Sequence, residues 1–235
     1  MPSVRSFLAT TAVVSMAAVS PFTLTPLAAD EKDFDRLSEA TTVFSEIMDA
    51  PDKGIPQDLL ESAHCIVIVP GLKKGAFIVG AKFGKGFVSC RQKATGKWSA
   101  PAAVRVEGGS VGFQIGGSET DVVLLVMNQR GADRLLSSQF TLGGEGEVAA
   151  GPVGRSATAQ TDAKLTAEML SWSRSRGIFA GVSLQGATLR EDEDANDSLY
   201  GKKLKNREIV EGSIAPPRGA ERLLSVLNRY SRREK

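Results

Sequence analysis

The stretch CIVIVPGLKKGAFIVGAKFGKGFVSCR, residues 65–91, decides how this chain folds. Its apolar runs, at 65–69, 76–79 and 87–88, are rich in β-branched and aromatic residues. Pro70-Gly71 and Gly84-Lys85-Gly86 separate these runs, and this punctuation predicts a tight meander of three antiparallel strands. Lysines gather at the predicted turns, so we expect an apolar sheet with cationic turns. Such a surface suits an anionic partner better than it suits catalysis.

Helices are predicted on the N-terminal side of this stretch. In residues 30–50, apolar side chains fall near one helical face, which predicts an amphipathic helix that ends before Pro51. Its apolar members are Phe34, Leu37, Val43, Phe44, Ile47 and Met48. A second, short helix is predicted from Pro56, because proline suits the first turn of a helix.

Strands are predicted from the quoted stretch onward to about residue 189. We expect strands at 103–106, 111–115, 121–128, 167–174 and 178–189, of which 121–128 is apolar enough to be buried on both faces. Residues 131–137 predict helical turns and residues 190–200 a polar turn. After Pro216-Pro217 an apolar stripe predicts a closing amphipathic helix. The predicted fold class is α+β, an antiparallel meander or barrel-like sheet with amphipathic helices flanking it at both ends.

The ends of the chain predict its destination and its domains. Residues 1–29 combine a positive Arg5, an apolar run and a small-residue cleavage site, a pattern typical of a secretory signal peptide. We therefore expect export to a periplasmic or secreted location, with peripheral membrane association. Residues 30–201 are expected to form the main domain, and residues 202–235 a basic tail whose helix packs on it. No later segment is long and apolar enough to span a bilayer.

Charge and cysteine content leave two points open. There are 29 Lys and Arg against 27 Asp and Glu, a net charge of +2, so no nucleic-acid partner is expected. Export makes a bond between Cys65 and Cys90 plausible. In the predicted meander, however, the two cysteines lie two strands apart, about 10 Å, which exceeds the usual disulfide span. This geometry favours two buried thiols, and a sheet that closes differently would permit the bond.

Catalysis has one motif in its favour. Residues 108–112 match G-x-S-x-G around Ser110. That motif needs a strand, a sharp turn and a helix, with the acid and histidine after the serine. The sole histidine, His64, precedes Ser110. The residues that follow Ser110 predict a strand and a turn rather than a helix. No metal or cofactor motif is present, so no cofactor is expected, and Asp121 is interpreted as a capping residue.

Several short motifs occur in a family-specific order. They are PGLKKGAFIVGAKFGKG (70–86), Cys90-Arg91, Trp98-Ser99-Ala100-Pro101, GFQIGG (112–117), Thr120-Asp121, AGPVGR (150–155), SRSRGIFAGVSL (173–184), and Asn196 with Tyr200-Gly201. In these segments, which span about 40–201, the chain resembles the SYLF-domain family, and most closely its exported bacterial members. The resemblance implies binding to anionic phospholipids or phosphoinositides, without catalysis. In eukaryotic relatives an N-terminal amphipathic helix assists membrane contact and some members bind actin.

This chain departs from that pattern in two ways. Its predicted signal peptide would keep it from cytosolic actin, and its N-terminal helix is acidic rather than basic. We therefore expect lipid contact at the sheet. Because turns of a meander alternate between its two edges, the expected cationic patch consists of Lys73, Lys74, Arg91, Lys93 and Lys97. Leu72 and Trp98 are expected to insert beside it, whereas Lys82 and Lys85 are expected at the opposite edge.

Three functions compete on this basis. The first is a non-enzymatic exported protein that binds anionic phospholipid at a membrane surface. The second is a structural or protein-interaction module of the cell envelope, with possible homo-oligomers. The third, and weakest, is a hydrolase that uses Ser110. The C-terminal helix, with Arg218, Arg222 and Arg229, is a rival lipid site, but we expect its leucines to pack on the sheet.

Overall fold

A computed structural model gives the arrangement of most of the chain. The structure describes residues 29–50, 54–76, 79–111, 116–145, 147–151, 167–175, 178–179, 184 and 186–231. Residues 1–28 of the predicted signal peptide, and residues 112–115 of the strand predicted at 111–115, lie outside these residues.

The described residues form one curled sheet and six helices around it. The strands are β1 (Cys65–Ala76), β2 (Val79–Cys90), β3 (Ala102–Val111), β4 (Gly116–Val126), β5 (Gln139–Thr141), β6 (Val148–Ala150), β7 (Met169–Ser175), β8 (Ile178–Phe179) and β9 (Thr188–Glu191). The helices are α1 (Ala29–Met48), α2 (Gln57–Ser62), α3 (Gln129–Leu135), α5 (Glu193–Tyr200), α6 (Asn206–Glu211) and α7 (Ala220–Tyr230). The strand order is β5-β9-β3-β2-β1-β4-β7-β6, with β8 paired to β7.

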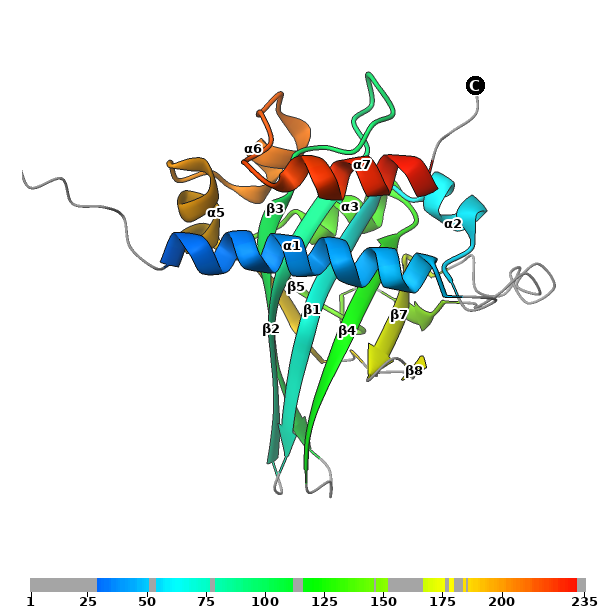
Figure 1. The fold of residues 1–235 in the computed structure, drawn as a ribbon. Helices are drawn as coiled ribbons and strands as arrows, with labels where there is room; N and C mark the ends of the chain where they lie inside the picture. Colours follow the sequence, from blue (N-terminus) through cyan, green and yellow to red (C-terminus); the bar gives the residue numbers. More distant parts are fainter. Residues whose placement is uncertain are drawn as a thin grey trace, which may run out of the picture.

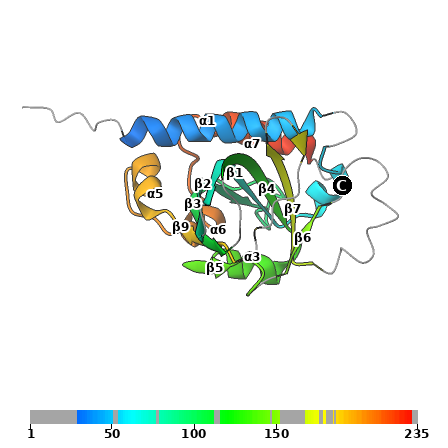
Figure 2. The same ribbon diagram turned by 90° about the horizontal axis from the view of Figure 1, so that it is seen from below.

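Helices cover only part of this sheet. Figure 1 shows α1 and α7 side by side across one end of the strands, while β1, β2 and β4 continue well beyond them. Seen from below, the sheet curls, with α3 and α6 on the side away from α1 (Figure 2). Two apolar clusters result, one between the sheet and α1, α2, α5 and α7, the other inside the curl with α3 and α6. The predicted α+β class, with a curled sheet and helices at both ends, is confirmed.

The quoted stretch forms two long strands, not the predicted three. β1 and β2 pair antiparallel, and Pro70-Gly71 lies at an irregularity inside β1 rather than at a turn. Gly71 has a φ of 57°, which glycine adopts without strain. The register places Cys65 directly opposite Cys90, and the two form a disulfide. The prediction of two free thiols is therefore wrong, because it counted an extra strand between them.

β4 is the strand that makes the sheet more than a meander. It pairs with β1 on one side and with β7 on the other, so β1 lies between β2 and β4. Its residues 122–126 are buried on both faces, as the uninterrupted apolar run predicted. Only β6 pairs parallel to its neighbour among the described strands.

The flanking helices follow the predicted pattern. α1 buries Leu37, Phe44 and Ile47 completely, and α7 buries Leu223 and Leu227 against the same cluster. This packing confirms that the C-terminal leucines face the domain. α2 begins directly after Pro56, as predicted.

Two predictions between residues 178 and 200 are wrong. Residues 178–189 do not form one strand, because β8 and β9 are separate short strands there. Residues 190–200 are not a polar turn, since most of them form α5. Asp192 caps this helix by accepting a hydrogen bond from the backbone N–H of Ala195, at 3.4 Å. Ala195 and Leu199 are one helical turn apart and buried, which gives the acidic segment an apolar side.

Candidate functional site

The predicted cationic patch is divided between two ends of the molecule. Lys73 and Lys74 lie far along β1, opposite Phe83 and Lys82 of β2. Arg91 follows the other end of β2, where Cys90 pairs with Cys65. From Cys65 to Lys74 a strand extends about 30 Å. Lys73 and Lys74 therefore form no common patch with Arg91, Lys93 and Lys97, and the expected exclusion of Lys82 from their end is wrong.

We name the two ends by their residues. The distal arm comprises residues 71–76, 79–84, 107–111 and 116–121, the parts of β1 to β4 that extend beyond the helices (Figure 1). The basal end comprises residues 64–69, 87–98 and 122–126, with the helices that cover them.

The distal arm has a cationic and partly apolar surface. Lys73 is exposed, and its cross-strand neighbour Phe83 is 49% exposed, the one exposed large apolar side chain among the described residues. Lys74 and Lys82 also face each other across the two strands. Desolvation, and secondly the nearby Lys82 charge, lower the pKa of Lys74, while desolvation lowers that of Lys82. Lys74 is partly exposed, whereas Lys82 is buried, so of this pair Lys74 is the cation that solvent reaches.

A hollow of about 930 Å³ lies beside these lysines. It is lined by Lys73, Lys74, Gly117, Ser118, Glu119, Asp121, Arg174 and Ser175. Residues of β1, β4 and β7 meet there, so the hollow follows the side of β4 at the root of the arm. Its cations outnumber its carboxylates by one.

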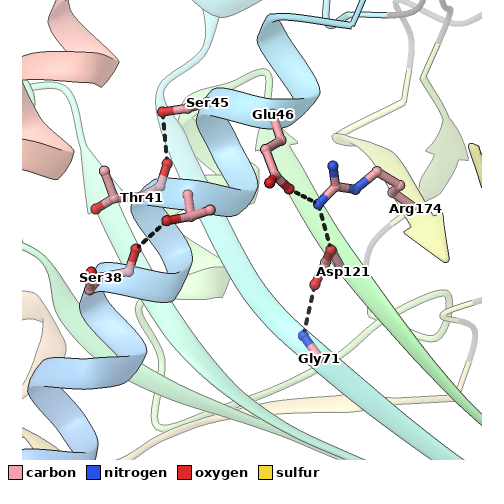
Figure 3. A network of polar contacts seen from close by, with 8 residues as sticks. Ser38, Thr41, Ser45, Glu46, Gly71, Asp121 and Arg174 are labelled. Carbon is pink, nitrogen blue, oxygen red and sulfur yellow. Dashed lines mark hydrogen bonds and ion pairs between the residues drawn. The ribbon is translucent and has the colours of Figure 1, made fainter. Parts of the chain in front are cut away.

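A polar network at the root of the arm connects it to α1 (Figure 3). Arg174 of β7 donates hydrogen bonds to Glu46 of α1 and to Asp121 of β4, the latter at 3.0 Å. Asp121 also accepts a hydrogen bond from the backbone N–H of Gly71, at 3.0 Å. Desolvation alone would lower the pKa of Arg174, but its bonds to the two carboxylates raise it. Asp121 therefore has the structural role that the sequence indicated.

Arg91 and Trp98 hold the basal end together. The Arg91 guanidinium lies 4.1 Å from the centre of the Trp98 ring. Arg91 donates to the carbonyl of Ser231 at 2.7 Å, and the Trp98 indole N–H donates to the Ser231 hydroxyl at 2.8 Å. Trp98 is 4% exposed and Leu72 is fully buried, so neither is placed to insert into a membrane in this conformation.

Two of the remaining predicted cations, Arg91 and Lys93, line a second hollow of about 720 Å³. His64, Arg91, Lys93 and the Cys65–Cys90 disulfide contribute to its wall, together with Arg207 of α6. Arg207 is paired with Glu211 at 2.7 Å. Lys93 and Lys97 are exposed, while Lys97 lies outside this lining.

Ser110 lies in the wrong setting for a nucleophile. It is within β3, paired with Gly80, rather than at a strand-to-helix turn. Gly80 pairs with Ala76, whereas His64 precedes the opposite end of β1, so His64 is more than about 30 Å from Ser110. Within the described ranges, no group of three or more His, Cys, Asp or Glu side chains could hold a metal ion. Nor does any helix of the described part have the length and apolar character to cross a membrane.

Two motif residues quoted from the sequence prove to be structural. The Asn196 side chain accepts a hydrogen bond from the Ala103 N–H at 2.7 Å and donates one to Asn206 at 2.8 Å. The Tyr200 hydroxyl donates to the Pro101 carbonyl at 2.7 Å, and desolvation raises its pKa. Sequence reasoning missed Phe83 and Arg174. The lone aromatic residue between Lys82 and Gly84 was the available signal for Phe83. Arg174 lies within the quoted motif 173–184, but its partners Glu46 and Asp121 are distant in sequence, so its role could not be deduced.

Comparison with known proteins places this arrangement in a family context. Residues 107–230 match the sequence model of the family Ysc84, described as "Las17-binding protein actin regulator". The chain is 40% identical over 178 residues to SH3 domain-containing protein PJ696.02 of Schizosaccharomyces pombe, covering 74% of this chain and 41% of that protein. It is 34% identical over 196 residues to SH3 domain-containing YSC84-like protein 1 of Rattus norvegicus, covering 83% and 56%.

A third relative has a name that refers to a partner. LAS seventeen-binding protein 3 of Saccharomyces cerevisiae is 37% identical over 180 residues, covering 75% of this chain and 39% of that protein. The match thus spans between about two fifths and somewhat over half of each relative's length. The family description and the name of this third relative refer to binding or regulation, the other two names refer to an SH3 domain, and none of them describes an enzyme.

Proposed function

The chain belongs to the Ysc84 family of SYLF domains, and from this premise we propose that it is a non-catalytic domain whose distal arm attaches to membranes rich in anionic phospholipid. The observation that carries the proposal is the position of Lys73, Lys74 and Phe83 on strands that project beyond the helices (Figure 1). A flat membrane can reach such an arm without displacing a helix.

The charges of the arm support this choice of ligand. Each lysine close to an anionic surface contributes about 1 kcal/mol. Of the two carboxylates in the row of Lys73, Glu107 is already paired with Arg105 at 3.1 Å and with Arg190 at 3.5 Å. Only Glu119, the cross-strand partner of Lys73, opposes the lysines there. The exposed part of Phe83 adds apolar contact to the electrostatic attraction.

Vesicle binding tests the proposal and locates the surface. Phosphatidylcholine vesicles with added phosphatidylserine should sediment the protein, and pure phosphatidylcholine vesicles should not. Replacing both Lys73 and Lys74 with Gln should weaken binding about thirtyfold, since two contributions of about 1 kcal/mol are lost. Added salt should weaken binding of the wild type as well.

The matched control is the Lys93→Gln, Lys97→Gln double variant, which removes the same charge from the basal end. It should bind vesicles like the wild type. If the basal variant loses binding and the arm variant retains it, the assignment to the arm is wrong. Equal sedimentation with neutral and anionic vesicles would refute the choice of lipid.

Export is part of the same proposal. Cleavage after residue 29 would deliver the domain to a membrane leaflet outside the cytosol. Intact-mass measurement on the protein recovered from its producing cell tests this, because a cleaved chain begins near Asp30. A full-length chain in the cytosolic fraction would contradict export.

Protein binding is a second candidate function, because the family description names Las17 and actin. A protein partner could use the same arm, where Phe83 is exposed beside Lys73. Co-sedimentation with actin filaments tests this directly, again with the paired Lys73 and Lys74 substitutions. Filament binding that is unaffected by vesicles would favour a protein site separate from the lipid surface.

A further inference from the structure

One edge of the distal arm lacks a neighbouring strand among the described residues. β7 pairs with Asp121–Val126 of β4, from Asp121 opposite Arg174 to Val126 opposite Met169. Residues 116–120 of β4 pair with β1 on one side and have no described strand on the other. The last two residues of β7, Arg174 and Ser175, also pair with β8. Among the residues that the structure describes, the edge of β4 therefore has no neighbouring strand where the arm begins to project.

The direction of the backbone groups on this edge can be deduced from one hydrogen bond. The Ser175 hydroxyl donates to the Glu119 carbonyl at 3.0 Å, so that carbonyl points away from β1. In a strand, the N–H and C=O of one residue point to the same side, and the pattern repeats every second residue. The N–H of Glu119 and both backbone groups of Gly117 thus point outward. Gly117 and Glu119 are exposed.

Space and charge next to this edge fit a particular ligand. The hollow of about 930 Å³ adjoins Gly117, Ser118 and Glu119 on one side and Arg174 and Ser175 on the other. Lys73 and Lys74 are consecutive on the adjacent β1, so one projects to each face of the sheet. β4 lies between β1 and an added strand, so each face of that strand would have a lysine about 10 Å away. Arg174 is already engaged by Glu46 and Asp121, which leaves Glu119 to oppose the two lysines.

We propose that residues 116–120 of β4 bind a short extended peptide with acidic side chains, which adds to the sheet as an antiparallel or parallel strand. Strand addition would supply partners for both outward groups of Gly117 and for the N–H of Glu119, whose carbonyl already accepts from Ser175. The open edge is only about 17 Å long, too little by itself for a stable dimer, which buries at least about 1,200 Å². A peptide is thus the occupant that the edge accommodates. The inference does not depend on membrane binding, although both involve Lys73 and Lys74.

Fluorescence polarisation with two labelled hexapeptides tests this site on the whole chain. One probe alternates valine and glutamate, and the other alternates valine and lysine. We expect the glutamate probe to bind and the lysine probe to bind at least about tenfold more weakly, because the lysines next to the edge attract only the former. Amide exchange at Gly117 and Glu119 should slow when the glutamate probe is added, since their N–H groups become hydrogen-bonded.

Substitutions at Gly117 separate the backbone contribution from changes of shape. Gly117→Pro removes an outward N–H, so the affinity for the glutamate probe should fall at least about tenfold. Gly117→Ala is the matched control, because it keeps the N–H and its Cβ would meet nothing closer than 3.7 Å. It should bind like the wild type. Glu119→Gln, which removes the opposing carboxylate, should bind more tightly, and equal melting temperatures verify that all variants are folded.

Three results would overturn the inference. The first is the absence of binding of the glutamate probe to the folded wild type. The second is equal affinity of the Gly117→Pro and Gly117→Ala variants for the glutamate probe. The third is concentration-dependent dimerisation that Gly117→Pro abolishes, which would make a second copy the occupant. Vesicle binding is a separate readout: Gly117→Pro keeps both lysines, so its vesicle binding should persist, and either proposal can fail without the other.

Discussion

The basal end and the distal arm share the strands β1, β2 and β4, yet they differ in almost every physical property. At the basal end, residues 65–69 and 122–126 are buried, and helices and a disulfide enclose them. In the arm, the same strands present Lys73, Gly75, Phe83 and Gly117 to solvent. The difference shows that a strand's pairing and its burial are independent. Pairing extends along the whole hairpin, and burial stops where the helices stop.

The largest expected effect contrasts an aromatic residue from each region. Trp98→Ala should reduce the free energy of unfolding by about 3–5 kcal/mol, because it empties a buried site and leaves the Ser231 hydroxyl and the Arg91 guanidinium without their contacts to the indole ring. Phe83→Ala in the arm should cost less than about 1 kcal/mol. Urea unfolding measures both. Similar losses would mean that the arm is packed as tightly as the basal end.

The second prediction concerns the disulfide, which closes the hairpin at its basal end. Replacing Cys65 and Cys90 with Ala should lower the free energy of unfolding by about 3 kcal/mol, chiefly by freeing the unfolded chain. A reducing agent should lower the melting temperature of the wild type and leave that of the double variant unchanged. If the reductant has no effect on the wild type, the two cysteines are not bonded in solution.

A smaller effect is expected at the network that joins the two regions. Arg174→Met keeps much of the side-chain volume but removes the hydrogen bonds to Glu46 and Asp121. It should therefore lower the free energy of unfolding by about 2 kcal/mol. Thermal unfolding gives the value. In a double-mutant cycle, Glu46→Gln should cost little once Arg174 has been replaced. Additive losses would show that α1 and the arm are not coupled through Arg174.

The smallest expected effect is a pH dependence of the arm. Because the pKa values of Lys74 and Lys82 are lowered from 10.5, these amines lose their charge before ordinary lysines do as the pH rises. As the pH is raised, vesicle binding should therefore begin to weaken before the pH reaches 10.5. At a pH between their lowered pKa values and 10.5, these two lysines bind more protons in the unfolded chain than in the folded chain. The free energy of unfolding should therefore rise as the pH is raised through this range. In the Lys74→Gln variant, vesicle binding should depend less steeply on pH than in the wild type. An unchanged dependence would contradict the role of Lys74.

Much of the basal end was predictable from local sequence. The apolar stripes of α1 and α7, the proline before α2 and the uninterrupted run in β4 each depend on neighbours close in the chain, and each prediction is confirmed. The predicted patch was less successful, because it depended on where the turns lie. Treating Pro70-Gly71 as a turn, rather than an irregularity within β1, shortened the strands and moved Lys73 and Lys74 to the wrong end.

By itself, the sequence determined that this chain forms an α+β domain with a curled sheet between amphipathic helices, because hydrophobic periodicity is written residue by residue. Only the tertiary structure decided that Cys65 meets Cys90 and that Arg174 joins α1 to β4. It also decided that Lys73 and Lys74 lie at the opposite end of the sheet from Arg91. The physical reason is strand register. A glycine that bends a strand and a glycine that ends it look alike in sequence, yet they place every later side chain differently.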